Sequence, residues 1–172
     1  DLAQEDAKTP SQEKPKDSVS KITLKGLPNA KTSDYMDLPN SLKVGDKTDK
    51  VKFPTSVKYV YCHFGVGDLS ANYYISLLKA LQNKYKKKPI FVAKEYHVNS
   101  SYANATEVNA KIDAFNLTMQ NYCNKTKYVI FLDISKGLVD DNGALLSTLS
   151  SDGYSFKDDA SEKKYYDNVK KY

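Results

Sequence analysis

The chain has 172 residues, of which 40% are hydrophobic, so it is long and apolar enough to form one domain with a real core and a tail. The formal net charge is +5 and all 26 basic residues are lysine, whereas proteins that read nucleic acids depend largely on the bidentate contacts of arginine, so we expect no nucleic-acid partner. No run of about 18 apolar residues occurs, so we expect no membrane span.

The first 19 residues have almost no apolar side chains to bury. They are rich in Lys, Glu, Asp, Ser, Gln and Pro, a composition that cannot offset the entropy cost of folding. We expect residues 1–19 to form a disordered leader or tether, and residues 20–172 to form a single domain. No signal peptide is visible, and the first residues could be what remains after one was removed.

Residues 20–56 are the hardest part of the chain to interpret. Gly, Pro, Asn, Asp and Lys are mixed there with scattered Leu, Val and Met, and no period is visible. Short strands are expected at Ile22–Leu24, Leu42–Val44 and Val51–Phe53. The last two would lie on either side of a polar turn at Gly45–Asp49.

The segment Val57–Asp68 organises the rest of the chain. Its first eight residues are mostly apolar or aromatic and predict a buried strand. Gly65 and Gly67 then allow a tight turn, and the apolar spacing from Tyr74 to Tyr85 predicts a helix. Because ligands bind parallel sheets at the carboxyl ends of the strands, we expect any site to lie beside this turn.

Strands and helices continue to alternate after this unit. Residues 89–93 and 128–132 predict buried strands, and a final helix is expected from about Ser161, after a long loop over residues 133–160. Between the two strands, a helix is predicted by apolar residues at helical spacing: Val108, Ile112, Phe115, Met119 and Tyr122. This alternation predicts the α/β class, with a three-layer α/β/α arrangement, a mainly parallel sheet and a flavodoxin-like shape.

The order of these features resembles the GDSL/SGNH hydrolase family. The resemblance covers residues 57–172. It rests on Gly65-Val66-Gly67-Asp68, on the strand end at Phe131-Leu132-Asp133, and on Asp152-Gly153-Tyr154-Ser155 before the last helix. It implies an SGNH hydrolase-like fold and the activity of a serine esterase, acetylesterase or lipase. The run over residues 141–145 and 151–153 is similar to secreted or surface-attached members from Gram-positive bacteria, which implies an extracellular location.

The chain departs from the family where the chemistry lies. Gly67 stands where the family has the asparagine that donates to the oxyanion, and Ser155 stands where it has the general base. No Gly-Asp-Ser block occurs, and the nearest string, Lys16-Asp17-Ser18, has no apolar strand before it. A serine needs an adjacent base to attack at neutral pH, and loss of one oxyanion donor alone costs about a hundredfold. The resemblance therefore implies a catalytically degraded domain.

The candidate site residues lie at the presumed ligand edge. His97 could act as a replacement base, whereas His63 is expected to be packed within the central strand. Asp68, Asp133 and Asp152 each also have an ordinary explanation: a helix cap, a loop start and a turn residue. Two histidines and two cysteines without a paired motif argue against a metal site, and no cofactor is expected. The expected binding edge consists of Gly65, Gly67, Asp68, Asp133, Asp152, Tyr154 and Ser155.

Two further patterns have two explanations each. Cys62 and Cys123 could form a disulfide or remain two buried thiols. The 14 tyrosines could include rings at the ligand edge that stack on sugars, although core and surface packing explains them as well.

Three functions stay open at this point. The first is an extracellular binding or assembly module for carbohydrate or for a cell-surface protein. The second is an active serine esterase or deacetylase of O-acylated carbohydrate with displaced catalytic residues, among them His97. The third is a binder of phosphate or nucleotide, which ranks last because the loop Gly65–Asp68 is too short and too acidic to cradle a phosphate.

Overall fold

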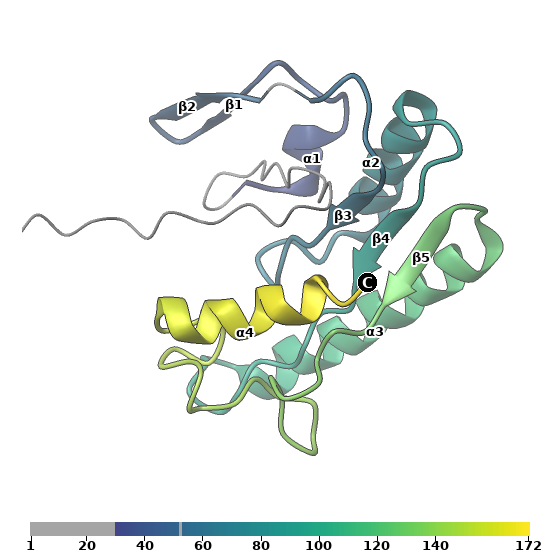
Figure 1. Ribbon diagram of the computed structural model, residues 1–172. Coiled ribbons are helices and arrows are strands. Elements are labelled where there is room, and N and C mark those ends of the chain that lie inside the picture. The colour runs from purple at the N-terminus through teal and green to yellow at the C-terminus, as the bar shows by residue number, and fades with distance from the viewer. Residues whose placement is uncertain (1–29, 52) are drawn as a thin grey trace, which may run out of the picture.

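The computed structural model describes residues 30–51 and 53–172 (Figure 1). The elements follow in the order α1 (Thr32–Tyr35), β1 (Ser41–Val44), β2 (Lys47–Lys50), β3 (Val60–Cys62), α2 (Ala71–Lys84), β4 (Ile90–Ala93), α3 (Ala105–Lys125), β5 (Val129–Leu132) and α4 (Asp159–Val169). The expected leader at residues 1–19 and the expected strand Ile22–Leu24 lie outside the described residues. Both stay predictions, as does the boundary of a single domain at residue 20.

Three parallel strands form the main sheet. β4 lies between β3 and β5, with Tyr61 opposite Phe91 and Phe91 opposite Ile130. α2 and α3 provide the crossovers that parallel strands require, so all three carboxyl ends lie at one edge. The predicted α/β class with a parallel sheet is confirmed. The strand predicted over Val57–Phe64 is shorter than expected, and among the described residues it is an edge strand and not the central one.

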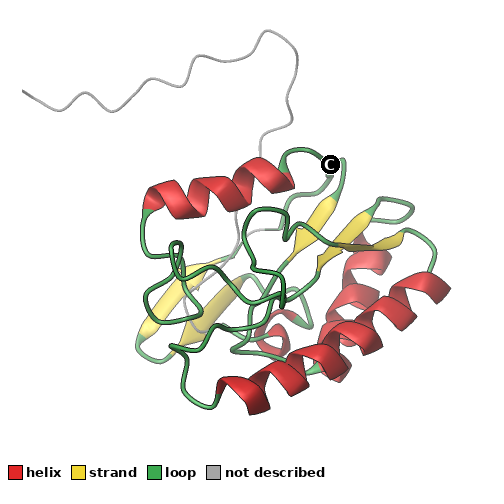
Figure 2. Cartoon of the chain, turned by 90° about the horizontal axis from the view of Figure 1, so that it is seen from below, coloured by secondary structure: helices red, strands yellow, loops and turns green. Residues whose placement is uncertain are grey.

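The two faces of this sheet pack against different elements (Figure 2). One apolar cluster joins the sheet to α2 and α3, and its strand residues are Cys62, Ile90, Val92 and Val129. The other joins the opposite face to α4 and to the loop after β5, and it includes Tyr61, Phe91, Leu132 and Tyr165. This division follows from the alternation of side chains along a strand. The α4 face is covered only in part, because Tyr59 is 44% and Ile130 is 41% exposed.

A separate antiparallel hairpin precedes the main sheet. The strand predicted at residues 42–44 is confirmed by β1, but the strand predicted at Val51–Phe53 is wrong: β2 lies earlier, at Lys47–Lys50. Val44 pairs with Lys47 across a two-residue turn, in which Gly45 adopts the left-handed conformation that such turns need. All four residues of β2 are exposed, so no apolar alternation marked it in the sequence.

Both cysteines are free and buried in the cluster that joins the sheet to α2 and α3. Burial raises the pKa of the Cys62 thiol to about 12 and that of the Cys123 thiol to about 11. Of the two explanations for these residues, the structure therefore shows the pair of buried thiols. Such thiols are protonated at neutral pH and behave as small apolar side chains.

Candidate functional site

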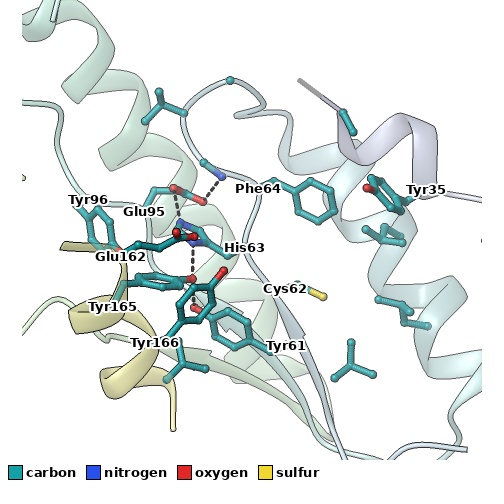
Figure 3. A pocket seen from close by; sticks show the side chains of 18 of the residues that line it. Tyr35, Tyr61, Cys62, His63, Phe64, Glu95, Tyr96, Glu162, Tyr165 and Tyr166 are labelled. Carbon is teal, nitrogen blue, oxygen red and sulfur yellow. Dashed lines mark hydrogen bonds and ion pairs between the residues drawn. The ribbon is translucent and has the colours of Figure 1, made fainter. Parts of the chain in front are cut away.

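A long cleft follows the edge of β3 that no described strand pairs with (Figure 3). It has a volume of about 1390 Å³ and is lined without interruption by residues 56–67. Side chains of α2 and α4 form its two walls. At the carboxyl end of β3, the glycine turn meets the loop Gly153–Ser155, which is where a parallel sheet places a ligand site.

Glu95 is a buried charge at this end of the cleft. It lies two residues after β4 and is only 3% exposed. Its carboxylate accepts a hydrogen bond from His63 Nε2 at 3.0 Å and another from the backbone N–H of Gly65 at 3.1 Å. The Asn116 side chain of α3 accepts from the Glu95 backbone N–H and donates to its C=O. Because a buried carboxylate requires donors, these contacts fix the loop after β3 against the end of β4.

His63 extends the network towards α4. Its Nδ1 lies 2.6 Å from the Tyr165 hydroxyl, which in turn lies 2.7 Å from the Tyr61 hydroxyl. The imidazole also stacks on the Tyr165 ring, with 5.4 Å between the ring centroids. An ionised carboxylate can only accept, so Nε2 carries a proton, and in the neutral ring Nδ1 accepts from Tyr165. Both ring nitrogens are thus engaged inside the protein, as Figure 3 shows.

Burial and charge act in opposite directions on His63. Burial lowers its pKa, but the attraction of Glu95 and the hydrogen bond to it together raise the pKa by more, so the net shift is upward. Burial is also the main cause that raises the pKa of the Tyr61, Tyr96 and Tyr165 hydroxyls. These tyrosines stay protonated at neutral pH and act as hydrogen-bonding groups, not as nucleophiles.

The described part of the cleft lacks the pairing that a serine hydrolase needs. Among the described residues, no serine, threonine or cysteine side chain is hydrogen-bonded to either histidine. Ser155 lines the cleft, but its backbone N–H is bound to Asp152 at 2.7 Å and its hydroxyl also faces that carboxylate. A hydroxyl without an adjacent base remains a poor nucleophile at neutral pH.

His97, the predicted replacement base, lines the cleft, but both of its ring nitrogens contact other protein groups. Its Nε2 lies 2.7 Å from an Asp113 carboxylate oxygen and its Nδ1 lies 3.1 Å from the backbone oxygen of Asn142. Both ring nitrogens therefore face acceptors that belong to the protein itself. The His97 backbone also bonds to Gly143 and Leu145 of the loop after β5. His97 therefore anchors this loop, and its placement gives no support to a role as base.

Asp68 joins two segments that are distant in the sequence. Its side chain is buried, and one carboxylate oxygen accepts from both the backbone N–H and the hydroxyl of Thr32. The other oxygen accepts from the Ser70 N–H at 3.3 Å, at the start of α2. Asp68 thus holds α1 against the glycine turn, a contact that the sequence did not indicate.

Asp133 lies at the carboxyl edge of the sheet but outside the residues that line the cleft. It pairs with Lys94 at 2.8 Å, and both side chains are partly exposed. Burial raises the pKa of Asp133, but hydrogen bonds from Lys94 and Ser135 lower it by more. The pair joins the ends of β4 and β5 at the surface and contributes little to stability.

Asp152 is a turn residue, which was the ordinary explanation of its position. One of its oxygens accepts from the backbone N–H groups of Tyr154 and Ser155 and from the Ser150 hydroxyl. Burial raises the pKa of Asp152, but these donors lower it by more, to about 2. The turn places Tyr154 over the glycine turn, where its hydroxyl would lie 2.8 Å from a Cβ added at Gly65.

Four residues of the expected binding edge therefore meet at the cleft: Gly65, Gly67, Tyr154 and Ser155. The residues that sequence reasoning missed are Glu95 and Tyr165, and His63 was assigned to packing. His63 and Glu95 had a detectable signal, because each follows a strand of the same sheet at the same edge. Tyr165 had none, since it is 102 residues away from His63.

Two buried tyrosine hydroxyls, those of Tyr74 and Tyr96, have no hydrogen-bond partner within the described ranges. Tyr96 is one of the residues that line the cleft. In the same part of the chain, no group of three His, Cys, Asp or Glu side chains is placed to hold a metal ion. None of the described helices combines the length and the apolar character needed to cross a membrane.

Comparison with known proteins identifies similar structures but no related sequence. No sequence profile of a protein family matches this chain, and no curated protein sequence matches it. The structure of a candidate platelet activating factor from Streptococcus pneumonia aligns over 67% of this chain and 59% of its own, with a TM-score of 0.57 and 20% identity. A family 3 carbohydrate esterase from Clostridium thermocellum aligns over 69% of this chain and 55% of its own, with 23% identity and a TM-score of 0.42.

The first of these similarities shows that this chain and that protein share a fold. The TM-score of the second is too low to support an argument. This chain spans less than two thirds of the length of either structure, so neither one's activity can be carried over to it.

Replacing Glu95 by glutamine is expected to lower the pKa of His63 below about 6.5, the ordinary value of histidine, because burial then acts without the carboxylate. The chain has only two histidines, so both imidazole signals can be followed by NMR in a pH titration and assigned with His97→Asn. In the wild type, the stability that His63 contributes is present below its ordinary pKa and is lost as the pH rises through the raised pKa of the folded protein. In Glu95→Gln the pH dependence of stability should reverse: the protein should lose stability as the pH falls below about 6.5, the ordinary pKa of histidine.

A control for this titration is Glu107→Gln, which removes an exposed carboxylate on α3 and should leave the His63 pKa unchanged. A His63 pKa that is the same in Glu95→Gln and in the wild type would show that the carboxylate does not govern the proton.

Gly65→Ala is expected to lower the free energy of unfolding by about 1–2 kcal/mol, because Gly65 is in the left-handed region and a Cβ would meet the Tyr154 hydroxyl. Gly67→Ala is the matched control, since a Cβ there has nothing within 4 Å. Denaturant unfolding measures both. Adding Tyr154→Phe to Gly65→Ala should recover the part of the loss that the contact causes, and equal losses at the two glycines would contradict this account.

Proposed function

We propose that this chain is a catalytically degraded, hydrolase-like domain that binds a ligand in the cleft beside β3 without cleaving it. One observation supports this most directly. His63 and His97 are hydrogen-bonded through both ring nitrogens to protein groups, and none of those groups in the described part of the chain is a serine, threonine or cysteine side chain. A fold can keep its cleft and its hydrogen-bonding groups after its nucleophile and base are gone.

Carbohydrate is the ligand class that suits the cleft best. Eight tyrosines line it: Tyr35, Tyr59, Tyr61, Tyr85, Tyr96, Tyr154, Tyr165 and Tyr166. A tyrosine ring packs against an apolar surface such as a sugar face, while its hydroxyl hydrogen-bonds at the rim. The Tyr96 hydroxyl is buried without a partner among the described residues, so a ligand hydroxyl that reached it would satisfy both groups.

The same proposal includes a setting for the domain. The similarity of residues 141–145 and 151–153 to secreted and surface-attached bacterial proteins favours an extracellular module. The partner would then be a surface carbohydrate or a cell-surface protein. For the complete domain we retain the three-layer α/β/α arrangement, which the apolar clusters on the two faces of the sheet favour.

An active serine esterase or deacetylase of O-acylated carbohydrate is the alternative, and the His63–Glu95 pair favours it. A carboxylate that orients an imidazole is two thirds of a catalytic triad. The nucleophile would have to come from outside the described residues, where Ser11, Ser18 and Ser20 lie. The Tyr165 hydroxyl would also have to leave Nδ1 so that the imidazole could accept a proton.

Hydrolysis of p-nitrophenyl acetate separates these two functions. If the domain only binds, the wild type and His63→Gln should release p-nitrophenol at the same rate as a protein without a site, because no base is paired with a nucleophile. A serine-directed phosphonate should have no effect. Steady turnover that the phosphonate blocks and that His63→Gln abolishes would establish the esterase instead.

Carbohydrate binding can be tested on a glycan array, followed by calorimetry with the best ligand. Tyr154→Ala removes a ring and a hydroxyl from the cleft and is expected to weaken binding about tenfold, which corresponds to roughly 1.4 kcal/mol. Tyr73→Ala is the control, since Tyr73 is 50% exposed on α2 and does not line the cleft. Equal affinity in the two variants, or no binding to any glycan, would contradict the proposed ligand class.

A further inference from the structure

The turns that precede β4 and β5 form a basic hollow at the amino-terminal edge of the sheet (Figure 1). It has a volume of about 380 Å³ and lies between the end of α2 and the turn that follows α3. The described residues that line it are Gln82, Tyr85, Lys86, Lys87, Lys88, Lys127 and Tyr128. Four of these residues are lysines and none is acidic, so positive charge is concentrated in a small space.

The surrounding chain offers no carboxylate to neutralise this charge. No Asp or Glu occurs between Asp68 and Glu95 or between Asp113 and Asp133, although the chain has 21 acidic residues. These two stretches hold eight lysines and include α2, β4, β5 and the second half of α3. Within the described ranges, none of the four lysines of the hollow forms an ion pair. Their charges are therefore available to a ligand.

The helix dipoles explain only part of this lysine cluster. The C-terminal ends of α2 and α3 carry a partial negative charge, which attracts cations within the last turn of each helix. This accounts for Lys84 and Lys125, which lie in those last turns. Lys86–Lys88 and Lys127 come after the helices and still line one hollow, so they require a further explanation.

The two turns are held against each other in spite of their like charges. The Gln82 side chain donates a hydrogen bond to the backbone oxygen of Lys127 at 3.1 Å, and the Ile90 N–H donates to the C=O of Tyr128 at 2.8 Å. Lys87 and Tyr128 both adopt the left-handed conformation, with φ of 63° and 67°, which is unfavourable for residues with large side chains. Strained residues persist where the surrounding structure fixes them, and they cluster at functional sites.

We propose that this hollow is a binding site for a small ligand that carries two or more linked phosphate groups. Its volume lies at the low end of the roughly 300–1,000 Å³ of small-molecule sites. Linked phosphates place several negative charges in a small space, which complements four lysines, and lysine binds phosphate as a point charge. The Lys127 ammonium lies 5.1 Å from the centroid of the Tyr128 ring, a contact that favours a position beside that ring.

This site is independent of the function proposed for the cleft. The hollow lies at the amino-terminal edge of the sheet, whereas His63 and Glu95 follow the carboxyl ends of β3 and β4. It also lies at the opposite edge from the loop Gly65–Asp68, where the sequence offered only a poor phosphate site. The hollow and the cleft share Tyr85 and Lys88. Variants that test the hollow should therefore leave both of these residues unchanged.

Calorimetry with sodium tripolyphosphate tests the site directly. The wild type should bind tripolyphosphate at least about tenfold more tightly than orthophosphate, because linked phosphates carry more charge. Lys86→Gln with Lys127→Gln removes one charge from each turn and should weaken this binding about tenfold or more. Both side chains are exposed, so the variant should fold. In the wild type, tripolyphosphate should shift the NMR amide signals of residues 85–88 and 126–128.

The matched control is Lys43→Gln with Lys47→Gln, which makes the same change in net charge on the exposed hairpin. It should change the affinity less than about twofold, since salt screens distant charges. Equal weakening in the two variants would overturn the proposal, as would no binding of tripolyphosphate or equal affinity for orthophosphate. Binding to phosphatidylglycerol vesicles without binding of tripolyphosphate would overturn it in favour of a lipid surface. The result of the glycan array bears only on the cleft, so the two proposals can fail separately.

Discussion

The buried carboxylate of Glu95 is the contact on which the rest of the site depends. A charge that leaves water must be hydrogen-bonded, so its two donors, His63 and the Gly65 N–H, are held as firmly as the carboxylate itself. Asn116 fixes the backbone of Glu95 from α3. Through its side chain and its backbone, Glu95 thereby joins the end of β4, the turn after β3 and a helix. Its loss would leave two donors without an acceptor in the interior.

The same contacts account for the binding role, without hydrolysis, that we propose for the cleft. The imidazole of His63 is used on one side by Glu95 and on the other by Tyr165, so it fixes α4 to the sheet. What remains for a ligand is the shape of the cleft, the tyrosine rings and their hydroxyls. The fold provides an edge where ligands bind, and the chemistry at that edge depends on a few side chains that can be lost separately.

Much of the fold could be predicted from the sequence, because α2 and α3 carry apolar residues at helical spacing, and Leu78 and Ile112 of these helices are fully buried. Among residues 30–56 only β1 was predicted correctly, since α1 has only four residues and β2 is exposed throughout. Gly65 and Tyr154 were predicted at the binding edge because turns have local signals, and both residues line the cleft. The role of His63 was missed because its partners depend on tertiary structure, and a histidine in an apolar run is more often packed in the core.

The hydrogen bonds of Tyr165 to Tyr61 and His63 connect residues 104 and 102 positions apart. Because α4 is the last of the described elements, this wall of the cleft cannot form until residue 169 has been synthesised. While the polypeptide is still emerging from the ribosome, the sheet face that α4 later covers is open to water and to other chains. The closure of this wall is therefore a late event in the biogenesis of the protein.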